Sequence, residues 1–369
     1  MARRGSLAVV LSVVALAVAI GHAYLWRRLV HDVGWPPSWS RALTWATIGI
    51  AVATPLAVLA GRVVAPRWSR WWLTPTYLWI GTATLACAAL LAVDLLRAVL
   101  GAPTPRAGAL AVVLFTLVAA AWASVEGRRV RVVRVEVPIA RLPRALDGLT
   151  IVQLSDLHVG PILGRRFVER VVATTQALAP DVVAITGDLV DAPVAELDAD
   201  VAALARLRAP LGCYFVTGNH EFHVDADAWC DHLGRLGVRV LRNARVTLAR
   251  GGASLELAGI DDDEGAPPQL AAVLAGRDRE VPLVLLAHRP HVIRAAGREG
   301  VDLQLSGHSH GGQLWPLPWL LRLDRLGRAG LRRFGATQLY VSCGTGHSGP
   351  PMRLGAPAEI TQIVLRAHG

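Results

Sequence analysis

Five stretches in the second half of the chain place metal-binding side chains directly after apolar runs. These stretches are Ser155-Asp156-Leu157-His158, Gly187-Asp188, Gly218-Asn219-His220-Glu221, Ala287-His288 and Gly307-His308-Ser309-His310. Imidazole, carboxylate and amide oxygen suit Mn²⁺, Fe or Zn²⁺, and the absence of thiolates argues against a structural zinc site. In α/β proteins such residues gather where parallel strands end, so the pattern predicts one shared site centred on Asp188.

The apolar runs before these residues have the length of buried strands. They are Ile151–Leu154, Val182–Ile185, Cys213–Val216, Leu283–Leu286 and Val301–Leu305. Phe167 and Val171 share one helical face between two of the runs. From Val238 to Leu257 the period shortens to two, which predicts antiparallel strands turned at Arg250-Gly251-Gly252. The pattern predicts an α/β domain over residues 127–369, with packed mixed sheets flanked by helices.

The five stretches, taken in order, resemble the signature of the metallophosphoesterase (calcineurin-like phosphoesterase) superfamily. The signature reads Asp-x-His, Gly-Asp-x-x-Asp, Gly-Asn-His-Glu, an isolated histidine and Gly-His-x-His, and the likeness covers roughly Leu149 to Arg366. Ala287-His288-Arg289-Pro290 and the sequence from Gly307 to Gln313 look most like the membrane-associated bacterial branch. The resemblance implies a sandwich of two mixed β-sheets flanked by helices.

The resemblance also implies two divalent metal ions, about 3.5–4 Å apart, that share one bridging carboxylate. Carried over to this sequence, the ligands are Asp156, His158, Asp188 and His310 for one ion and Asp188, Asn219, His288 and His308 for the other. The implied mechanism is in-line attack by a metal-bound hydroxide without a covalent phospho-enzyme. His220 takes the family's part of contacting the phosphate and protonating the leaving oxygen.

Departures from the motifs of two sister families argue against a protein Ser/Thr phosphatase and against a purple acid phosphatase. Protein Ser/Thr phosphatases carry Arg-Gly after the second aspartate of the motif, whereas Asp191 is followed by Ala192-Pro193. Purple acid phosphatases place a tyrosine ligand shortly after the bridging aspartate, and this segment has none.

The remaining acidic residues near the motifs are not counted as metal ligands. We expect Asp191 and Glu221 to orient the metal ligands. The acidic run 261–264 is interpreted as a loop and not as a third metal site.

The first third of the chain is apolar, in keeping with a hydrophobic content of 53% for the whole sequence. Four runs approach the ~20 residues that a spanning helix needs: Leu7–Tyr24, Ala42–Val64, Tyr77–Leu100 and Ala109–Ser124. Tryptophans fall at or between the ends of these runs, as in the aromatic belts of membrane proteins. Residues 1–126 are therefore predicted to form an all-α anchor of about four transmembrane helices.

One acid, Asp94, lies inside a predicted span. It could serve a proton or substrate relay, or it could pair with Arg97 one helical turn away at the interface. We favour the pairing with Arg97.

Arginine counts predict the orientation of this multi-pass anchor. With the N-terminus inside, nine arginines flank the spans on the inner side and five on the outer side. The positive-inside rule then places the catalytic domain in the cytoplasm, at the cell membrane. We interpret the net charge of +10 as an attraction to anionic lipid and not to nucleic acid, because no nucleic-acid-binding motif accompanies the charge. No protein partner is inferred.

The segment after the last histidines suggests a class of substrate. Leu314 to Leu321 is apolar, includes Trp315 and Trp319, and is followed by five arginines up to Arg333. It could be a helix or lid packed on the domain, or a lip that rests among lipid headgroups. We favour the lip, with Trp315 and Trp319 in contact with substrate. Arg289, beside His288, could clamp a phosphate or make a surface salt bridge.

These observations favour a membrane-anchored dinuclear-metal phosphohydrolase that cleaves a phosphodiester or pyrophosphate bond. The expected substrate is lipid-linked. Two alternatives stay open: a general phosphodiesterase or phosphatase acting on soluble substrates, and a non-catalytic metal-binding sensor.

Overall fold

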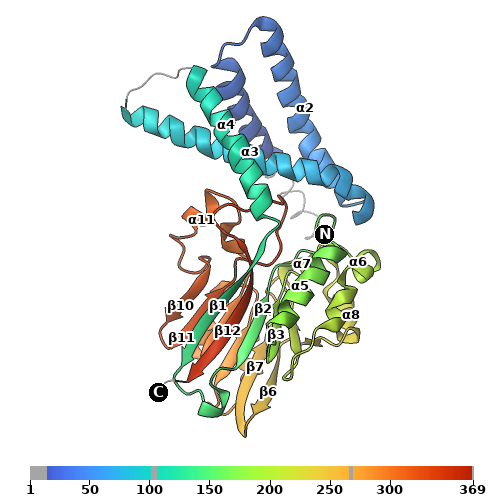
Figure 1. The fold of residues 1–369 in the computed structure, drawn as a ribbon, viewed down its shortest axis with the longest axis vertical. Coiled ribbons are helices and arrows are strands. Elements are labelled where there is room, and N and C mark those ends of the chain that lie inside the picture. The colour runs from blue at the N-terminus through green and yellow to red at the C-terminus, as the bar shows by residue number, and fades with distance from the viewer. Residues whose placement is uncertain (1–14, 101–105, 266–268, 368–369) are drawn as a thin grey trace. The chain divides into compact units, whose positions relative to one another are not determined.

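The computed structural model describes residues 15–100, 106–265 and 269–367, without the side chains of residues 106 and 107 (Figure 1). The chain divides into two compact units. The helical unit comprises Met1–Glu126 together with Gly349–Leu354, and the α/β unit comprises Gly127–Ser348 together with Gly355–Gly369.

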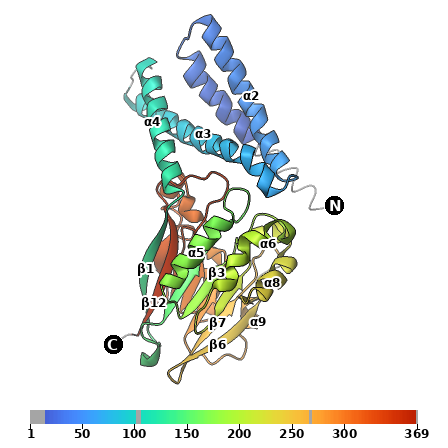
Figure 2. The ribbon, with the colours of Figure 1, turned by 45° about the vertical axis from the view of Figure 1, so that its right-hand side comes forward.

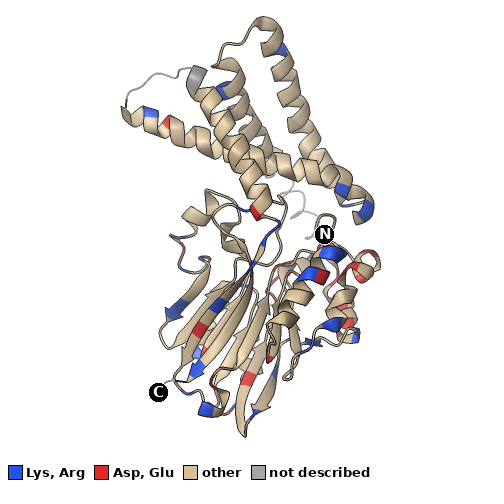
Figure 3. Ribbon diagram, in the orientation of Figure 1, with Lys and Arg blue, Asp and Glu red and all other residues tan. Residues whose placement is uncertain are grey.

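The helical unit begins with a helix over residues 15–26 that continues into a π-helical turn, η1 (Arg27–His31). Three longer helices follow, α2 (Pro37–Gly61), α3 (Pro66–Leu100) and α4 (Arg106–Glu126). Figure 3 shows that charged residues lie mainly towards the ends of these helices. Within the described residues, three helices are long and apolar enough to cross a membrane, namely Pro37–Gly61, Pro66–Leu100 and Gly108–Glu126. The predicted span Leu7–Tyr24 lies partly outside the described residues.

The expected pairing of Asp94 with Arg97 is wrong. Tyr24 Oη donates to Asp94 Oδ2 at 2.7 Å, and the guanidinium of Arg28 pairs with Asp94 Oδ1. Both partners come from the first helix and its π-helical turn, 66 to 70 residues earlier in the chain. Spacing along a helix could suggest the neighbour one turn away, but helix packing supplied the closer partners.

The first sheet of the α/β unit has six strands in the order β1-β12-β2-β3-β4-β5. The strands are β1 (Val130–Ile139), β12 (Ala358–Ala367), β2 (Thr150–Leu154), β3 (Val182–Thr186), β4 (Cys213–Val216) and β5 (Arg239–Val240). Strands β2 to β5 run parallel, and β12 is antiparallel to β2.

The second sheet has six strands in the order β10-β11-β9-β8-β7-β6. They are β10 (Gly330–Phe334), β11 (Thr337–Val341), β9 (Leu303–Ser306), β8 (Leu283–Leu286), β7 (Ala253–Gly259) and β6 (Ala244–Arg250). β7, β8 and β9 are parallel, and β6 and β7 form the predicted hairpin, with Arg250 paired to Ala253. Gly251 and Gly252 both have positive φ, as the tight turn requires.

Alternation along the strands divides their side chains among three cores. Ile151, Val182 and Val216 of the first sheet pack between the sheets with Leu257 and Leu286 of the second. The opposite face of the first sheet is covered by the helices α5 (Arg165–Ala177), α6 (Val194–Val201) and α8 (Ala226–Arg235) (Figure 2). The helices α9 (Leu270–Val273) and α10 (Ile293–Arg298) pack on the outer face of the second sheet. The predicted fold class, two mixed sheets flanked by helices, is confirmed.

Candidate metal centre

The candidate site forms where the two sheets end. β2, β3 and β4 are parallel neighbours in one sheet, and β8 and β9 are parallel neighbours in the other. Their carboxyl ends therefore bring the five predicted stretches to the same edge of the sandwich. Asn219 and His220 open the short helix α7 (Asn219–Val224) directly after β4.

A first cluster contains Asp156, His158 and His310, which are all buried. The Nε2 atoms of the two histidines face each other at 3.0 Å, and His310 Nε2 is 3.5 Å from Asp156 Oδ1. The Asp156 carboxylate also accepts hydrogen bonds from Ser155 Oγ at 2.6 Å and from the backbone N–H of His308 at 3.0 Å. Converging imidazole nitrogens beside a carboxylate make a ligand set that fits a divalent cation.

A second cluster contains Asp188, His288 and His308. His288 Nε2 lies 3.2 Å from Asp188 Oδ2 and 3.3 Å from His308 Nδ1, which is 3.1 Å from Asn219 Oδ1. His288 Nδ1 donates to the carbonyl of Thr186 at 2.8 Å, so Nε2 is the nitrogen that faces the cluster.

Asp188 lies between the clusters. Its Oδ2 atom is 3.2 Å from His288 Nε2 in the second cluster and 3.8 Å from His158 Nε2 in the first. The second oxygen, Oδ1, accepts the backbone N–H of His220 at 2.9 Å. One carboxylate thus faces both ligand groups, as a residue that bridges two ions must.

Electrostatics differ between the two histidines of the second cluster. Burial acts to lower the pKa of His288, but the neighbouring carboxylates, with Asp188 first among them, together outweigh burial and raise this pKa to about 10. Burial and the neighbouring His288 lower the pKa of His308 to about 4. The carboxylates thus stabilise positive charge where a cation would be bound, so protons and metal compete for these groups.

Five of the predicted ligands have left-handed backbone conformations. The φ angles are 54° for Asp156, 48° for His158, 51° for Asp188, 68° for His308 and 50° for His310. This region is unfavourable for residues with a Cβ atom and is often occupied at functional sites. The surrounding structure therefore holds the ligands in conformations that the free chain avoids.

Glycines allow the loops to approach the carboxylates closely. A Cβ atom at Gly218 would lie 2.2 Å from Asp188 Oδ1, and one at Gly307 would lie 2.2 Å from Asp156 Oδ2. Both distances are far below van der Waals contact, so only glycine fits these positions beside the expected ligands.

Asp191 holds two histidines in place. Its Oδ1 atom accepts from His158 Nδ1 and from His220 Nδ1, each at 2.8 Å. Burial acts to raise the pKa of Asp191, but the two imidazoles outweigh burial and keep this pKa well below its usual value. Since both Nδ1 atoms bind Asp191, both Nε2 atoms are directed to the cluster.

Glu221 joins the loops after β3 and β4. Its fully buried carboxylate accepts the backbone N–H groups of Asp188 at 3.0 Å, Leu189 at 2.7 Å and Gly218 at 2.7 Å. Burial and the negative charge of Asp188 raise the pKa of Glu221 to about 7, against the effect of these N–H donors. The residue orders the backbone on both sides of Asp188.

Comparison with known proteins identifies the family. The sequence profile of the calcineurin-like phosphoesterases matches residues 149–312. An uncharacterized metallophosphoesterase of Aquifex aeolicus is 34% identical over 257 residues, which cover 68% of this chain and 97% of that protein. The chain belongs to the metallophosphoesterase family. The family is one of metal-dependent phosphoesterases, and the histidine–aspartate clusters of this chain could hold metal ions.

Two vertebrate relatives are named as transmembrane proteins. Proteins called "transmembrane protein with metallophosphoesterase domain" are 40% identical over 250 residues in Danio rerio and 42% identical over 253 residues in Bos taurus. Each alignment covers 64% of this chain and 57% of the relative's length. Together with the three apolar helices, these relatives support association of this metallophosphoesterase with a membrane.

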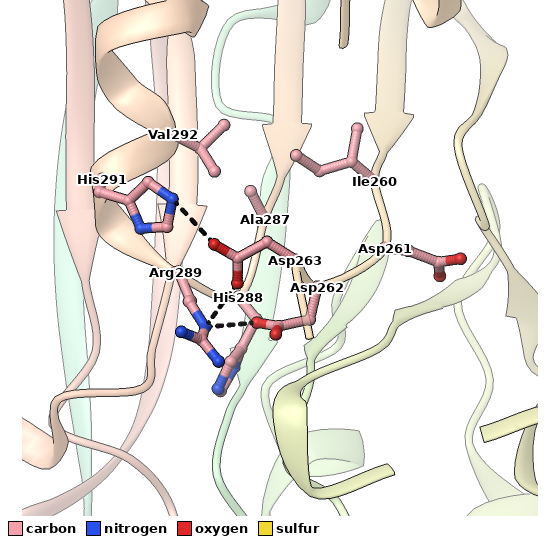
Figure 4. Close-up of a pocket in the computed structure, with 9 residues that line it drawn as sticks. All are labelled: Ile260, Asp261, Asp262, Asp263, Ala287, His288, Arg289, His291 and Val292. Carbon is pink, nitrogen blue, oxygen red and sulfur yellow. Dashed lines mark hydrogen bonds and ion pairs between the residues drawn. The ribbon is translucent and has the colours of Figure 1, made fainter. Parts of the chain in front are cut away.

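The acidic run of this metallophosphoesterase is bound by arginine and histidine side chains. Arg289 Nε lies 2.9 Å from Asp262 Oδ2 and 3.0 Å from Asp263 Oδ1, and His291 lies 3.3 Å from Asp263 (Figure 4). Arg289 also pairs with Glu264 at 3.2 Å. The run is thus a loop crosslinked to the start of η4 (Pro290–Val292), and within the described residues it forms no metal-binding cluster.

One segment that braces the site, after β11, carries no ligand motif that predicts this role. The backbone N–H groups of Thr345 and Gly346 donate to the carbonyls of Ser155 and Asp156, at 2.7 and 2.9 Å. A Cβ atom at Gly346 would lie 2.1 Å from the carbonyl oxygen of Leu157. The glycine-rich run after β11 was the only available signal, and it contains no conventional ligand motif.

Proposed function

We propose that this chain is a membrane-anchored hydrolase that uses two divalent cations to cleave a phosphodiester or pyrophosphate bond, with a lipid-linked substrate. The proposal depends on the two ligand clusters that share Asp188. The Oδ2 atom of Asp188 lies within 4 Å of a histidine in each cluster. Two cations held so closely can neutralise a phosphoryl group and lower the pKa of the attacking water.

Each cluster would hold one cation. Asp156, His158 and His310 would bind the first, Asn219, His288 and His308 the second, and Asp188 both. The mixed nitrogen and oxygen ligands suit Mn, Fe or Zn. Because Asp188 Oδ2 faces both clusters, this one carboxylate would hold the two charges together without a thiolate.

His220 would supply the proton for the leaving oxygen. Its Nδ1 is bonded to Asp191, and its Nε2 lies 4.0 Å from Asp188 Oδ2, on the side of the cluster. Burial acts to lower the pKa of His220, but Asp191 and Asp188 outweigh burial and raise it. This shift favours the protonated imidazole, whose Nε2–H would be transferred to the leaving group.

The proposal of a lipid-linked substrate is based on apolar side chains that follow the metal-binding histidines in the chain. Trp315 is half-buried and Trp319 is 67% exposed, a few residues after His310. Both would contact an acyl or polyprenyl chain while the phosphate lies at the clusters. Arg289 would help to orient the phosphate from beside His288, in competition with the carboxylates that bind it now.

The proposed topology is multi-pass, with the α/β unit in the cytoplasm. It follows from the excess of arginine on the inner side of the expected spans. A reporter fused after Gly369 that is active only when exported should stay silent. A strong signal from that reporter would reverse the assignment.

The catalytic proposal is tested with purified full-length protein, Mn²⁺ and bis-p-nitrophenyl phosphate. Asp188→Asn removes the shared negative charge and should abolish turnover together with binding of the second metal equivalent, as measured by elemental analysis. His220→Ala should retain both metals and lose about 10²–10⁴-fold in kcat.

The matched control is His232→Ala on α8, where the imidazole contacts the ring of Trp229 and not the clusters. This variant should retain its metals and its turnover. A wild-type protein that binds two metals but turns over no diester under Mn²⁺, Fe²⁺ or Zn²⁺ would favour a sensor over an enzyme.

The substrate class requires a separate comparison. Trp315→Ser with Trp319→Ser should lower kcat/KM much more for a lipid-linked diphosphate than for the soluble diester. An equal loss on both substrates would contradict the lipid-linked substrate and leave the hydrolase assignment intact.

A further inference from the structure

The α/β unit carries a concentrated patch of exposed apolar side chains on α11 (Leu317–Leu320) and the turn after it. We call this patch the apolar lip and define it as Leu317, Trp319, Leu320 and Leu323, which are 51, 67, 54 and 85% exposed. Among the described residues from 127 onwards, Val132 is the only other large apolar side chain that is exposed. Contiguous exposed apolar side chains of this kind mark an interaction site.

The backbone beneath the lip is fixed next to the metal centre. A Cβ atom at Gly312 would lie 2.5 Å from the backbone nitrogen of Pro318, so α11 packs directly on η5 (His310–Gly312). Pro318 also lies against Gly355, which pairs with Leu314. The backbone of the lip is therefore packed on η5 and Gly355, while its apolar side chains are exposed.

Exposed arginines border the lip. Arg322, Arg325 and Arg328 follow within eight residues of Leu320, and Asp324 is the one acid among them. The Asp324 carboxylate accepts the backbone N–H groups of Leu326 and Gly327, both at 2.9 Å, so it serves the turn. Apolar side chains bordered by arginine match the depth profile of a bilayer surface, where acyl chains lie below anionic phosphates.

We propose that the apolar lip inserts between the headgroups of a lipid bilayer, with Arg322, Arg325 and Arg328 on the lipid phosphates. Lipid is the occupant that the chain favours, because its own three apolar helices bring a bilayer within reach. Tryptophan and arginine both prefer the interfacial layer. This contact goes beyond the proposed hydrolysis and would exist even if the substrate were soluble.

The test measures lipid contact at the lip in the reconstituted full-length protein. In a Cys87→Ala, Cys343→Ala background, Leu320→Cys carries an environment-sensitive fluorophore, since the remaining Cys213 and Cys230 are buried. The vesicles contain phosphatidylcholine and phosphatidylglycerol with brominated acyl chains. We expect the bromines to quench the label at residue 320 several-fold more than the same label at Asp231→Cys, an exposed position on α8.

Replacing the arginines beside the apolar lip tests the proposal in a second, independent way. Replacing Arg322, Arg325 and Arg328 by Gln should weaken lipid contact in anionic vesicles by up to about fivefold for each arginine. Equal quenching at residues 320 and 231 would overturn the proposal. A label at 320 that is shielded from both bromolipid and aqueous iodide would also overturn it, because the lip would then pack on protein. Neither outcome depends on catalysis, so failure of the proposed hydrolysis is distinguishable.

Discussion

At the scale of single residues, two carboxylates that are not expected metal ligands control the histidines and loops that are. Asp191 fixes the rings of His158 and His220 through one oxygen atom. Glu221 binds the backbone N–H groups of Asp188, after β3, and of Gly218, after β4. Groups that orient metal ligands in this way commonly change metal affinity or activity by about 10–100-fold when they are removed.

Asp191 offers a test of this positioning. Asp191→Ala removes both hydrogen bonds and should lower metal affinity and kcat about 10–100-fold, measured by metal titration and diester turnover. Asp191→Asn keeps an acceptor oxygen but loses the charge, and should show a smaller loss. Asp198→Asn, exposed on α6, is the control and should behave as wild type. Equal effects of the Ala and Asn variants would mean that charge, and not orientation, is what Asp191 provides.

At the scale of elements, the strand ends could be predicted because apolar runs and the polar residues after them are local features. The hairpin at Gly251-Gly252 was predictable for the same reason. Contacts across the sandwich were not, since His158 and His310 meet across 152 residues of chain and two sheets. The partners of Asp94 were missed because they come from another helix. The role of Thr345 was missed because it binds the backbone of Ser155, 190 residues earlier in the chain, and belongs to no ligand motif.

Gly307 tests how closely β2 and β9 must approach. In Gly307→Ala the added Cβ atom would lie 2.0 Å from Ser155 Oγ and 2.2 Å from Asp156 Oδ2, so the loop must move. We expect weaker metal binding and a loss of stability of about 1–3 kcal/mol, measured by metal titration and thermal unfolding. Gly234→Ala on α8 meets nothing within 4 Å and should raise stability by up to about 1 kcal/mol. A Gly307→Ala variant with wild-type affinity would show that the loop adapts freely.

At the scale of the whole molecule, metal binding and folding should be linked. The ligands come from both sheets, and five of them have left-handed conformations that metal coordination would help to hold. Metal at ~100 times its dissociation constant should stabilise the α/β unit by about 2.7 kcal/mol. Thermal unfolding with Mn²⁺ against EDTA measures this difference, and Asp188→Asn should lose most of it. An unfolding temperature that is insensitive to EDTA in the wild-type protein would contradict the linkage.

The helical unit includes the segment Gly349–Leu354, which lies more than 200 residues after the last helix of that unit in the chain. Met352 is fully buried, and a Cβ atom at Gly81 on α3 would lie 2.4 Å from its Sδ atom and 3.2 Å from Pro350 Cβ. Arg353 N–H also donates to the carbonyl of Ala123 on α4, at 2.8 Å. Gly81→Leu should therefore expel the segment and destabilise the helical unit by about 1–3 kcal/mol.

Thermal unfolding of Gly81→Leu in detergent measures this loss, and diester turnover provides a second reading. The displaced segment, Gly349–Leu354, begins three residues after Gly346, and the N–H groups of Thr345 and Gly346 bond to the backbone of Ser155 and Asp156. Some loss of kcat is therefore expected even though α3 carries no expected metal ligand. A Cβ atom at Gly49 on α2 would meet nothing within 4 Å, so Gly49→Leu is the matched control. If both variants unfold at the wild-type temperature, the segment contributes nothing to the helical unit. If only Gly81→Leu is destabilised and its kcat is unchanged, the packing is structural and the metal centre is independent of it.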